Sequence, residues 1–216
     1  MPELNPPEQI SFEDIGITIS EHDIALLSTW ITLNATRKRN PHASFETLRD
    51  TRDYSYIRKF SALLNSVDAR PPTRIESLTR ELYEAAMEPF ATYLGATLVP
   101  LQSRYAAAAH LYLPGDEPSE GHIDYYPSVN FYLKAPSKGG ELLIAKSKYQ
   151  SNLELIREDA YHVQPEPRTL ILFSGTVLPH FVDRLPATAI GVRAGINATY
   201  WDGSRPESTH TRWTQQ

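Results

Sequence analysis

Two histidines and one aspartate have the types and spacing of a metal site. His122 and Asp124 are two positions apart in a segment that we expect to be extended, so both side chains point to the same face. His180 comes much later in the chain, after an apolar run and a turn. Two imidazoles and one carboxylate form a facial triad with open coordination positions, an arrangement that suits non-haem Fe(II).

Other interpretations of these three residues stay open. Zinc is also held by two imidazoles and one carboxylate, although the sequence lacks the H-E-x-x-H segment typical of many zinc peptidases. An isolated H-x-D pattern also occurs by chance in exposed turns. The residue types therefore predict a metal site without choosing the metal.

Arg193 is unusual because it lies within 191–201, a segment that we expect to form a buried strand. Arginine is almost never fully buried without a partner. A dicarboxylate ligand is one natural partner, through paired charge-assisted hydrogen bonds. An internal salt bridge and a place on an edge strand are the alternatives.

The second half of the chain alternates short apolar segments with turn residues, which predicts a β-rich unit. We expect strands near residues 97–101, 107–113, 129–133, 141–145, 161–164, 169–173, 180–183 and 189–201. This many short strands indicate a closed or double-sheet unit such as a jelly roll.

The first half is expected to be mainly helical. Ser20 opens an S-x-x-D capping box before one helix, a second helix is expected near 45–64, and a third begins near Thr73. Pro89 should end or kink the third helix, and Gly95 is a plausible stop. We therefore predict one catalytic domain over 1–216, mainly β with N-terminal helices (α+β). It would comprise helical support to about 96, a core at about 97–202 and a tail at 203–216.

The order of motifs resembles that of a known family. The motifs are His122-x-Asp124, Gly139-Gly140-Glu141-Leu142, Leu170-Ile171-Leu172-Phe173, His180 and Arg193, preceded by Tyr112-Leu113-Pro114-Gly115. This order is similar to that of the Fe(II)/2-oxoglutarate-dependent dioxygenases, and most similar to the prolyl-4-hydroxylase-like group. The resemblance covers about residues 100–201.

The resemblance implies a double-stranded β-helix (jelly-roll) core with helices packed on one sheet. It implies that His122, Asp124 and His180 bind Fe(II), with 2-oxoglutarate as co-substrate and O2 as oxidant. It also implies that Arg193 binds the distal carboxylate of 2-oxoglutarate and that Tyr112 donates to the same group. The motif order makes His180 the third ligand rather than His162 or His210.

Two further positions bear on this resemblance. The family often has Ser two residues after the Arg, where this chain has Gly195, so that hydroxyl is missing. In related halogenases a small residue replaces the carboxylate ligand. Asp124 retains it, which favours hydroxylation over halogenation.

Substrate contacts are expected close to the metal ligands. Tyr126 follows the H-x-D motif at the expected entrance, and Arg104 is a candidate anchor for a substrate carboxylate. Asn130 and Tyr132 share one face of the next strand, and facing inward they would form a polar pocket. The alternative, favoured by the apolar residues between them, is that those apolar residues form the core and the polar ones face outward.

Composition restricts the function further. The 216 residues carry a net charge of −5, include no cysteine and contain no apolar run long enough to cross a membrane. The acidic balance argues against a nucleic-acid partner, and the missing cysteines exclude thiolate metal sites and fit a cytoplasmic protein.

We therefore expect an enzyme that hydroxylates a C–H bond of a small molecule, such as an amino acid or a biosynthetic intermediate, while 2-oxoglutarate is decarboxylated to succinate. One alternative is a hydroxylase of prolyl or other protein side chains. Another, of a different class, is a non-catalytic jelly-roll or cupin-like binding protein. The sequence gives no prediction of oligomeric state.

Overall fold

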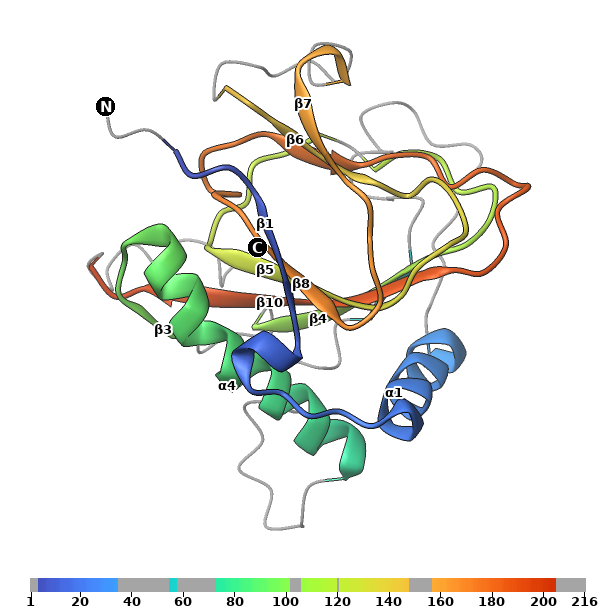
Figure 1. The fold of residues 1–216 in the computed structure, drawn as a ribbon, viewed down its shortest axis with the longest axis horizontal. Coiled ribbons are helices and arrows are strands. Elements are labelled where there is room, and N and C mark those ends of the chain that lie inside the picture. The colour runs from blue at the N-terminus through green and yellow to red at the C-terminus, as the bar shows by residue number, and fades with distance from the viewer. Residues whose placement is uncertain are drawn as a thin grey trace, which may run out of the picture.

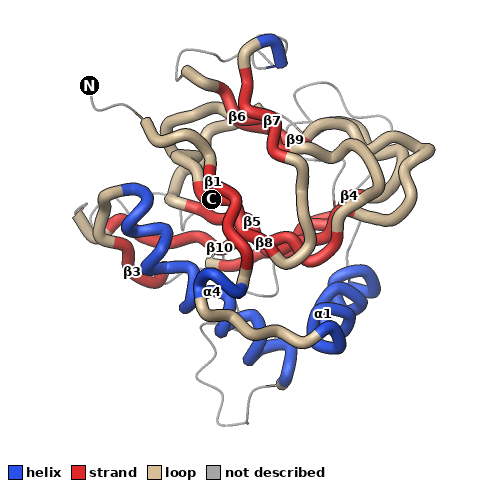
Figure 2. Tube along the Cα trace, in the orientation of Figure 1, coloured by secondary structure: helices blue, strands red, loops and turns tan. Residues whose placement is uncertain are grey.

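The computed structural model describes residues 4–34, 55–57, 73–101, 106–119, 121–147 and 157–204. Within these residues the chain forms two antiparallel β-sheets and two α-helices (Figure 1). The smaller sheet lies opposite the larger one, and the helices lie on the other side of the larger sheet (Figure 2).

The larger sheet has the strand order β1-β8-β5-β10-β4-β2, and β3 pairs with β10 off this path. Its strands are β1 (Glu8–Ser11), β2 (Ser55–Ile57), β3 (Leu98–Pro100), β4 (Ala107–Tyr112), β5 (Ser128–Lys134), β8 (Thr169–Leu172) and β10 (Arg193–Asp202). The central strand β10 is ten residues long. Its Arg193 end pairs with β4 and β5, and its Asp202 end pairs with β3.

The smaller sheet consists of β7 (Ala160–Val163), β6 (Leu142–Ala145) and β9 (His180–Val182), in that order. Leu142, Leu143, Ile144 and Ala145 of β6 are all buried, because β6 is the middle strand. His180 is the first residue of β9, so this sheet contributes one of the expected metal ligands.

Both helices begin directly after a residue whose side chain caps the first turn. The helix α1 (Glu21–Asn34) follows Ser20, whose Oγ accepts a hydrogen bond from the Asp23 amide at 3.1 Å. The helix α4 (Arg74–Leu94) has a complete capping box at Thr73 and ends at Gly95, whose φ of 61° is the left-handed conformation that glycine adopts readily. Arg74 forms an ion pair with Asp23 at 2.6 Å, which joins the starts of the two helices.

The main hydrophobic core lies between the helices and the outer face of the larger sheet. It contains residues from α1 and α4, together with Val129, Phe131 and Leu133 of β5. A second cluster, with Tyr112, Tyr132, Ile144 and Phe173, lies between the two sheets. Alternate residues of β5 therefore enter different buried layers, and both faces of this strand are covered.

The structure differs from the sequence-based expectation at several places. Ser55–Ile57 form strand β2, paired with β4, where a helix was expected; the rest of 45–64 lies outside the described residues. The helix α4 continues through Pro89 to Leu94, and buried Ala86 and Phe90 pack it against the core on either side of the proline. Strand β1 was not expected, and β10 begins at Arg193 rather than at 189.

No helix among the described residues is long and apolar enough to span a membrane.

Candidate metal centre and adjoining cavities

His122, Asp124 and His180 come together as the sequence predicted. One ligand atom of each lies within 4.8 Å of the other two. Asp124 Oδ1 is 3.6 Å from His122 Nε2 and 3.7 Å from His180 Nε2. These separations suit three donors that share a single cation, because metal–nitrogen and metal–oxygen bonds in such sites are about 2 Å long.

Backbone hydrogen bonds place the three ligands. The His122 and His180 amides each donate to the other residue's carbonyl, at 3.0 and 2.9 Å, which forms an isolated antiparallel bridge. The Asp124 amide donates to the Gly175 carbonyl at 2.8 Å. The extended His122–Asp124 segment is therefore held against β9 and the turn before it, which brings the His122 and Asp124 side chains close to His180.

The imidazole of His180 is oriented by its second nitrogen. Its Nδ1 lies 3.1 Å from the Leu178 carbonyl, and because a carbonyl only accepts, Nδ1 must be the protonated nitrogen of this pair. The lone pair on Nε2 is then directed toward the metal position. The Phe173 ring packs edge-on against the imidazole, with ring centroids 4.8 Å apart.

Gly175 is a part of the site that sequence reasoning missed. A Cβ at this position would lie 2.8 Å from Asp124 Oδ2 and 3.0 Å from the Phe173 ring. Only a residue without a side chain leaves room for the carboxylate here. The sequence does show a glycine two residues after Phe173, which could have indicated a close contact at this position. A glycine after a strand, however, more often marks a simple turn.

The carboxyl of Asp124 stays ionised in this environment. Burial raises its pKa, but the neighbouring His180 and the hydrogen bond from His122 outweigh burial, so the pKa of Asp124 lies below its ordinary value. A charged carboxylate beside two imidazoles is the protonation state in which this set binds a divalent cation.

Arg193 is buried in the interior, as expected, with 4% of its surface exposed. Its Nη2 donates to the Tyr132 hydroxyl at 3.1 Å, and its guanidinium lies 5.0 Å from the ring centroids of both Tyr112 and Tyr132. Among the described residues it forms no ion pair with a carboxylate, and its Nε, also buried, has no hydrogen-bond partner there. A buried guanidinium with an unused donor is a strong site for an anionic ligand.

Arg193 and the three expected metal ligands line the same cavity, which has a volume of about 120 Å³. Its other lining residues are His110, Tyr112, Ser119, Asn130, Leu142, Phe181, Val182 and Asn197. Asn130 faces inward, so the outward orientation favoured from the apolar pattern is wrong for this residue. Its side-chain Oδ1 accepts a hydrogen bond from the side-chain Nδ2 of Asn197 at 3.3 Å.

Tyr132 lies inside the protein, but next to Arg193 rather than in an open substrate pocket. It is 99% buried, and its ring and hydroxyl both contact the arginine. The outward orientation that the apolar pattern favoured is therefore wrong for Tyr132 as well as for Asn130. The inward alternative gives the right layer, but the parity of a strand does not reveal which part of the interior a side chain reaches.

The missing hydroxyl at position 195 has a structural reason. The register of β10 against β5 shifts between Ala194 and Gly195, and a Cβ at Gly195 would lie 2.3 Å from the Phe131 carbonyl oxygen. No side chain fits there without movement of the strand. The Tyr132 hydroxyl is the polar group that the structure places beside Arg193 instead.

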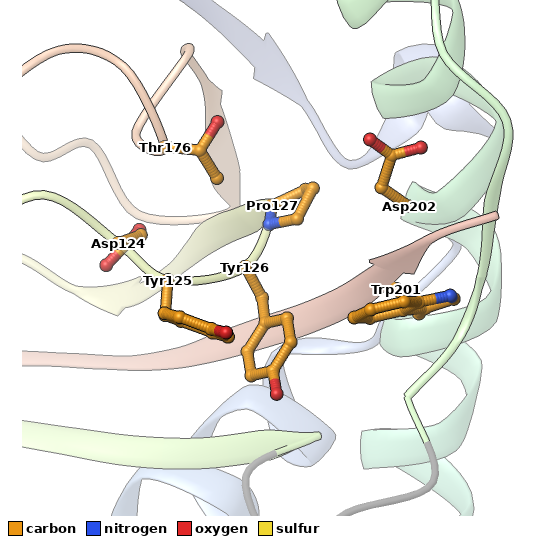
Figure 3. Close-up of a pocket in the computed structure, with 7 residues that line it drawn as sticks. All are labelled: Asp124, Tyr125, Tyr126, Pro127, Thr176, Trp201 and Asp202. Carbon is orange, nitrogen blue, oxygen red and sulfur yellow. The ribbon is translucent and has the colours of Figure 1, made fainter. Parts of the chain in front are cut away.

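A second cavity of about 290 Å³ adjoins the site, and Asp124 lines both cavities. Tyr125, Tyr126, Pro127, Thr176, Trp201 and Asp202 complete its lining (Figure 3). The predicted entrance residue Tyr126 is therefore present, together with Trp201 and Asp202, which sequence reasoning did not select. Arg104 lies outside the described residues.

The other candidate third ligands do not join the triad. His162 is on β7 with about half of its side chain exposed, and its Nδ1 pairs with Glu141 at 2.9 Å. His210 lies outside the described residues.

Comparisons with known proteins show which solved structures have a similar fold. No protein-family model and no curated protein matches the sequence. Solved structures do match over most of the chain. A prolyl-4-hydroxylase from Pseudomonas putida is 14% identical, with a TM-score of 0.53 over 91% of this chain and 92% of that one. A prolyl hydroxylase from Trichoplax adhaerens, solved with a hypoxia-inducible-factor peptide, is 16% identical, with a TM-score of 0.55 over 92% and 84%.

A third similar structure is SnoK, an α-ketoglutarate-dependent carbocyclase of nogalamycin biosynthesis. It is 11% identical, with a TM-score of 0.58 over 93% of this chain and 80% of that chain. The chain therefore has the fold of the 2-oxoglutarate- and Fe(II)-dependent oxygenases, with the prolyl-4-hydroxylases among its structural neighbours. The resemblance predicted from the sequence is confirmed at the level of the fold.

Proposed function

We propose that this protein is an Fe(II)/2-oxoglutarate-dependent oxygenase that hydroxylates a C–H bond of a small molecule. We also assign its two facing sheets to the double-stranded β-helix of that class and treat the chain as one catalytic domain. The observation that carries the proposal is that a His-Asp-His triad and a buried, incompletely hydrogen-bonded arginine line one cavity.

The donor set fits Fe(II). Two imidazoles and one carboxylate from two segments give three ligands on one side of an ion and leave the other positions for a chelating co-substrate and O2. When bound, Fe(II) and 2-oxoglutarate supply the oxidising chemistry, with succinate and CO2 as the co-products. The chain itself holds the metal, orients the co-substrate and excludes water.

Arg193 is the proposed partner for the distal carboxylate of 2-oxoglutarate. Its Nε has no partner among the described residues, and a carboxylate that approached this edge of the guanidinium would accept two parallel hydrogen bonds. Tyr112 and Tyr132 lie against the guanidinium and keep it in place, and the Tyr132 hydroxyl is close enough to Arg193 to reach the same carboxylate.

The substrate would bind in the second cavity, beside Asp124. Its volume of about 290 Å³ is at the lower end of the range for small-ligand pockets, which supports a small substrate. Tyr126 lines it, as expected, and Asn130 is reassigned to the co-substrate cavity.

The proposal is tested by anaerobic titration of the protein with Fe(II) and 2-oxoglutarate, monitored by the weak visible charge-transfer band that the resemblance to this class implies. We expect a band that the His180→Ala variant loses and that requires more 2-oxoglutarate in the Arg193→Lys variant. Exposed Arg184, which pairs with Glu117 at the surface, provides the control variant Arg184→Lys.

A folded wild-type protein that gives no band would contradict the proposal. Metal analysis would then distinguish a zinc site from a binding protein without redox chemistry.

A protein side-chain hydroxylase is the second candidate. Ile123 and Tyr125 alternate with the metal ligands and are 49% and 54% exposed, so an apolar surface that a peptide could cover adjoins the site. Formation of succinate with a peptide library but with no small molecule would favour this candidate.

A further inference from the structure

Four polar side chains lie in a row on the inner face of the larger sheet. Asn197 of β10 is opposite Asn130 of β5, and the next inward pair along the same strands is Thr199 opposite Ser128. The two asparagines line the cavity of about 120 Å³ that also contains Arg193 and the metal triad. Thr199 and Ser128 are 7% and 4% exposed. Polar groups in such a place need hydrogen-bond partners, either within the row or from a bound ligand.

The hydroxyl proton of Thr199 has one good acceptor. The Ser128 hydroxyl donates to the Tyr126 carbonyl at 2.9 Å, and because a hydroxyl has a single proton, Ser128 cannot also donate to Thr199. The two hydroxyl oxygens are 3.5 Å apart, which is longer than an ordinary O–H···O hydrogen bond. The Thr199 hydroxyl therefore donates to Asn197 Oδ1, at 3.0 Å.

This hydrogen bond orients both asparagine amides. With its Oδ1 occupied by Thr199, Asn197 donates from Nδ2 to Asn130 Oδ1 at 3.3 Å. One proton of the Asn197 amide and both protons of the Asn130 amide are then left without an acceptor among the described residues. The groups that the pair has available for a ligand in the cavity are therefore N–H donors.

We propose that Thr199 is a positioning residue that keeps the N–H groups of Asn130 and Asn197 available to an oxyanion of the ligand in this cavity. The Asn197 amide cannot turn its oxygen toward the ligand without losing the hydrogen bonds to Thr199 and Asn130. An amide oxygen that faced a carboxylate would repel it, and this repulsion is stronger in a buried site than in water.

The oxyanion is the carboxylate of 2-oxoglutarate that lies next to the metal, and this identification rests on the proposed oxygenase function. Arg193 and Asn197 share one face of β10 and are separated by roughly 13 Å of strand. The Arg193 guanidinium stays between the rings of Tyr112 and Tyr132, at its own end of the row. A ligand whose distal carboxylate pairs with Arg193 therefore meets the asparagines with its other end.

Loss of the Thr199 hydroxyl tests the positioning. 2-Oxoglutarate is titrated by calorimetry into the protein loaded with Zn(II), which has no redox chemistry and so permits no turnover. Thr199→Val should weaken binding about threefold to tenfold, as one lost hydrogen bond does, and Thr199→Ser should bind within about twofold of wild type. A valine variant that binds like wild type, or a serine variant as weak as the valine one, would overturn the proposal.

Thr169→Val is the matched control. Thr169 is another buried threonine of the larger sheet, and its hydroxyl donates to the Glu166 carbonyl at 2.7 Å instead of to an asparagine. Its variant should bind 2-oxoglutarate like wild type. An equal loss of affinity in Thr169→Val and Thr199→Val would assign the effect to general loosening of the sheet and would overturn the proposal.

Side-chain amide signals give a direct readout of the contact. In ¹⁵N-labelled protein loaded with Zn(II), the Asn130 amide protons should shift downfield when 2-oxoglutarate binds, and they should shift much less in Thr199→Val. Asn5, whose exposed amide donates to the Tyr93 carbonyl, should not shift. Asn130 signals that stay in place while the ligand binds would overturn the proposal.

Levulinate tests which end of the ligand the asparagines contact. It keeps the keto group and the distal carboxylate of 2-oxoglutarate and has a methyl group in place of the carboxylate next to the metal. Its binding, followed by NMR of the ligand at high concentration, should be the same in Thr199→Val and wild type. Equal losses for both ligands would overturn the assignment of the oxyanion. Failure of wild type to bind 2-oxoglutarate would overturn the oxygenase proposal itself, whereas normal binding in every Thr199 variant would overturn only this inference.

Discussion

The His122 and His180 backbones exchange two hydrogen bonds, of 3.0 and 2.9 Å, although the two residues are far apart in the sequence. This pair fixes the spacing of the two imidazoles, whose ring centroids lie 4.4 Å apart, before any metal is bound. The third ligand is placed by a separate contact, between Asp124 and Gly175. We therefore expect metal binding at this proposed site to depend on backbone contacts as well as on the three side chains.

The Gly175→Ala variant should lose metal affinity while it keeps the fold. Its Cβ would lie 2.8 Å from Asp124 Oδ2, so the carboxylate must rotate or shift away from the two imidazoles. We expect metal binding to weaken about 10- to 100-fold, the usual effect of disturbing a group that orients a ligand. Titration with Co(II), followed by its visible spectrum, measures this.

The control is Gly203→Ala, because a Cβ there has its nearest contact at 3.4 Å, with the Thr97 carbonyl oxygen, and lies outside the site. Metal affinity equal to that of wild type in Gly175→Ala would show that Asp124 does not depend on the empty space at position 175.

Loss of the Tyr132 hydroxyl should weaken 2-oxoglutarate binding. Tyr132→Phe keeps the ring against Arg193 and removes the 3.1 Å hydrogen bond, which is worth roughly 1.5 kcal/mol to a charged group, or about tenfold in affinity. Equilibrium dialysis with labelled 2-oxoglutarate and a divalent metal measures it. Tyr161→Phe on the smaller sheet should bind like wild type, and a Tyr132→Phe affinity within twofold of wild type would count against the assignment.

Placing a serine at position 195, as the family that the sequence resembles often has, should destabilise this protein. The new Cβ would lie 2.3 Å from the Phe131 carbonyl oxygen, so β10 and β5 must move apart. Overpacking of this kind costs about 1–3 kcal/mol, and each kcal/mol lowers the melting temperature by about 2–4 °C in a chain of this size. Calorimetry of Gly195→Ser checks this, and an unchanged melting temperature would mean that the strands yield easily.

Tyr83 should make the protein sensitive to alkali. Its hydroxyl donates to the Thr199 carbonyl at 2.9 Å and accepts from the Leu101 amide at 3.0 Å, which joins α4 to the end of β10. Burial raises the pKa of Tyr83 from 10.0 to about 12. Because the folded pKa is the higher one, the neutral hydroxyl stabilises the fold fully below pH 10, and this contribution is lost as the pH rises from about 10 to 12.

The Tyr83→Phe variant separates this contribution from other effects of alkali. It leaves the Leu101 amide without its acceptor, so we expect it to lower the unfolding free energy by about 1–3 kcal/mol at neutral pH. Between pH 10 and 12 the difference from wild type should shrink, as shown by urea unfolding at each pH. A constant difference would assign the alkaline loss to other groups, such as the adjacent buried Tyr200.

Local patterns in the sequence predicted the strands of the second half and the pairing of His122 with Asp124, whereas His180 was chosen by the order of motifs that resembles the dioxygenases. Alternation and turn residues locate a strand whatever it pairs with, and the spacing of His122 and Asp124 already places both on one face. The capping residues Ser20 and Thr73 marked the starts of the two described helices for the same reason, since a cap acts within its own turn.

Features that depend on distant segments could not be predicted. Strand β1 exists because Glu8–Ser11 pair with β8, and the short segment has no alternation of its own. At Ser55–Ile57 pairing with β4 overrides the helical spacing of the sequence. The contacts of Gly175 with Asp124 and of Tyr132 with Arg193 arise only when the two sheets face each other.

The pairing of β1 with β8 has a consequence for how the protein behaves in solution. Its four residues pair with the whole length of β8 and cover backbone groups that would otherwise form an open sheet edge. An uncovered strand edge recruits strands from other molecules. Strand β1 is therefore the end strand of the sheet in place of β8, and we expect its removal to leave the edge of β8, a strand of four buried residues, open to pairing with another molecule.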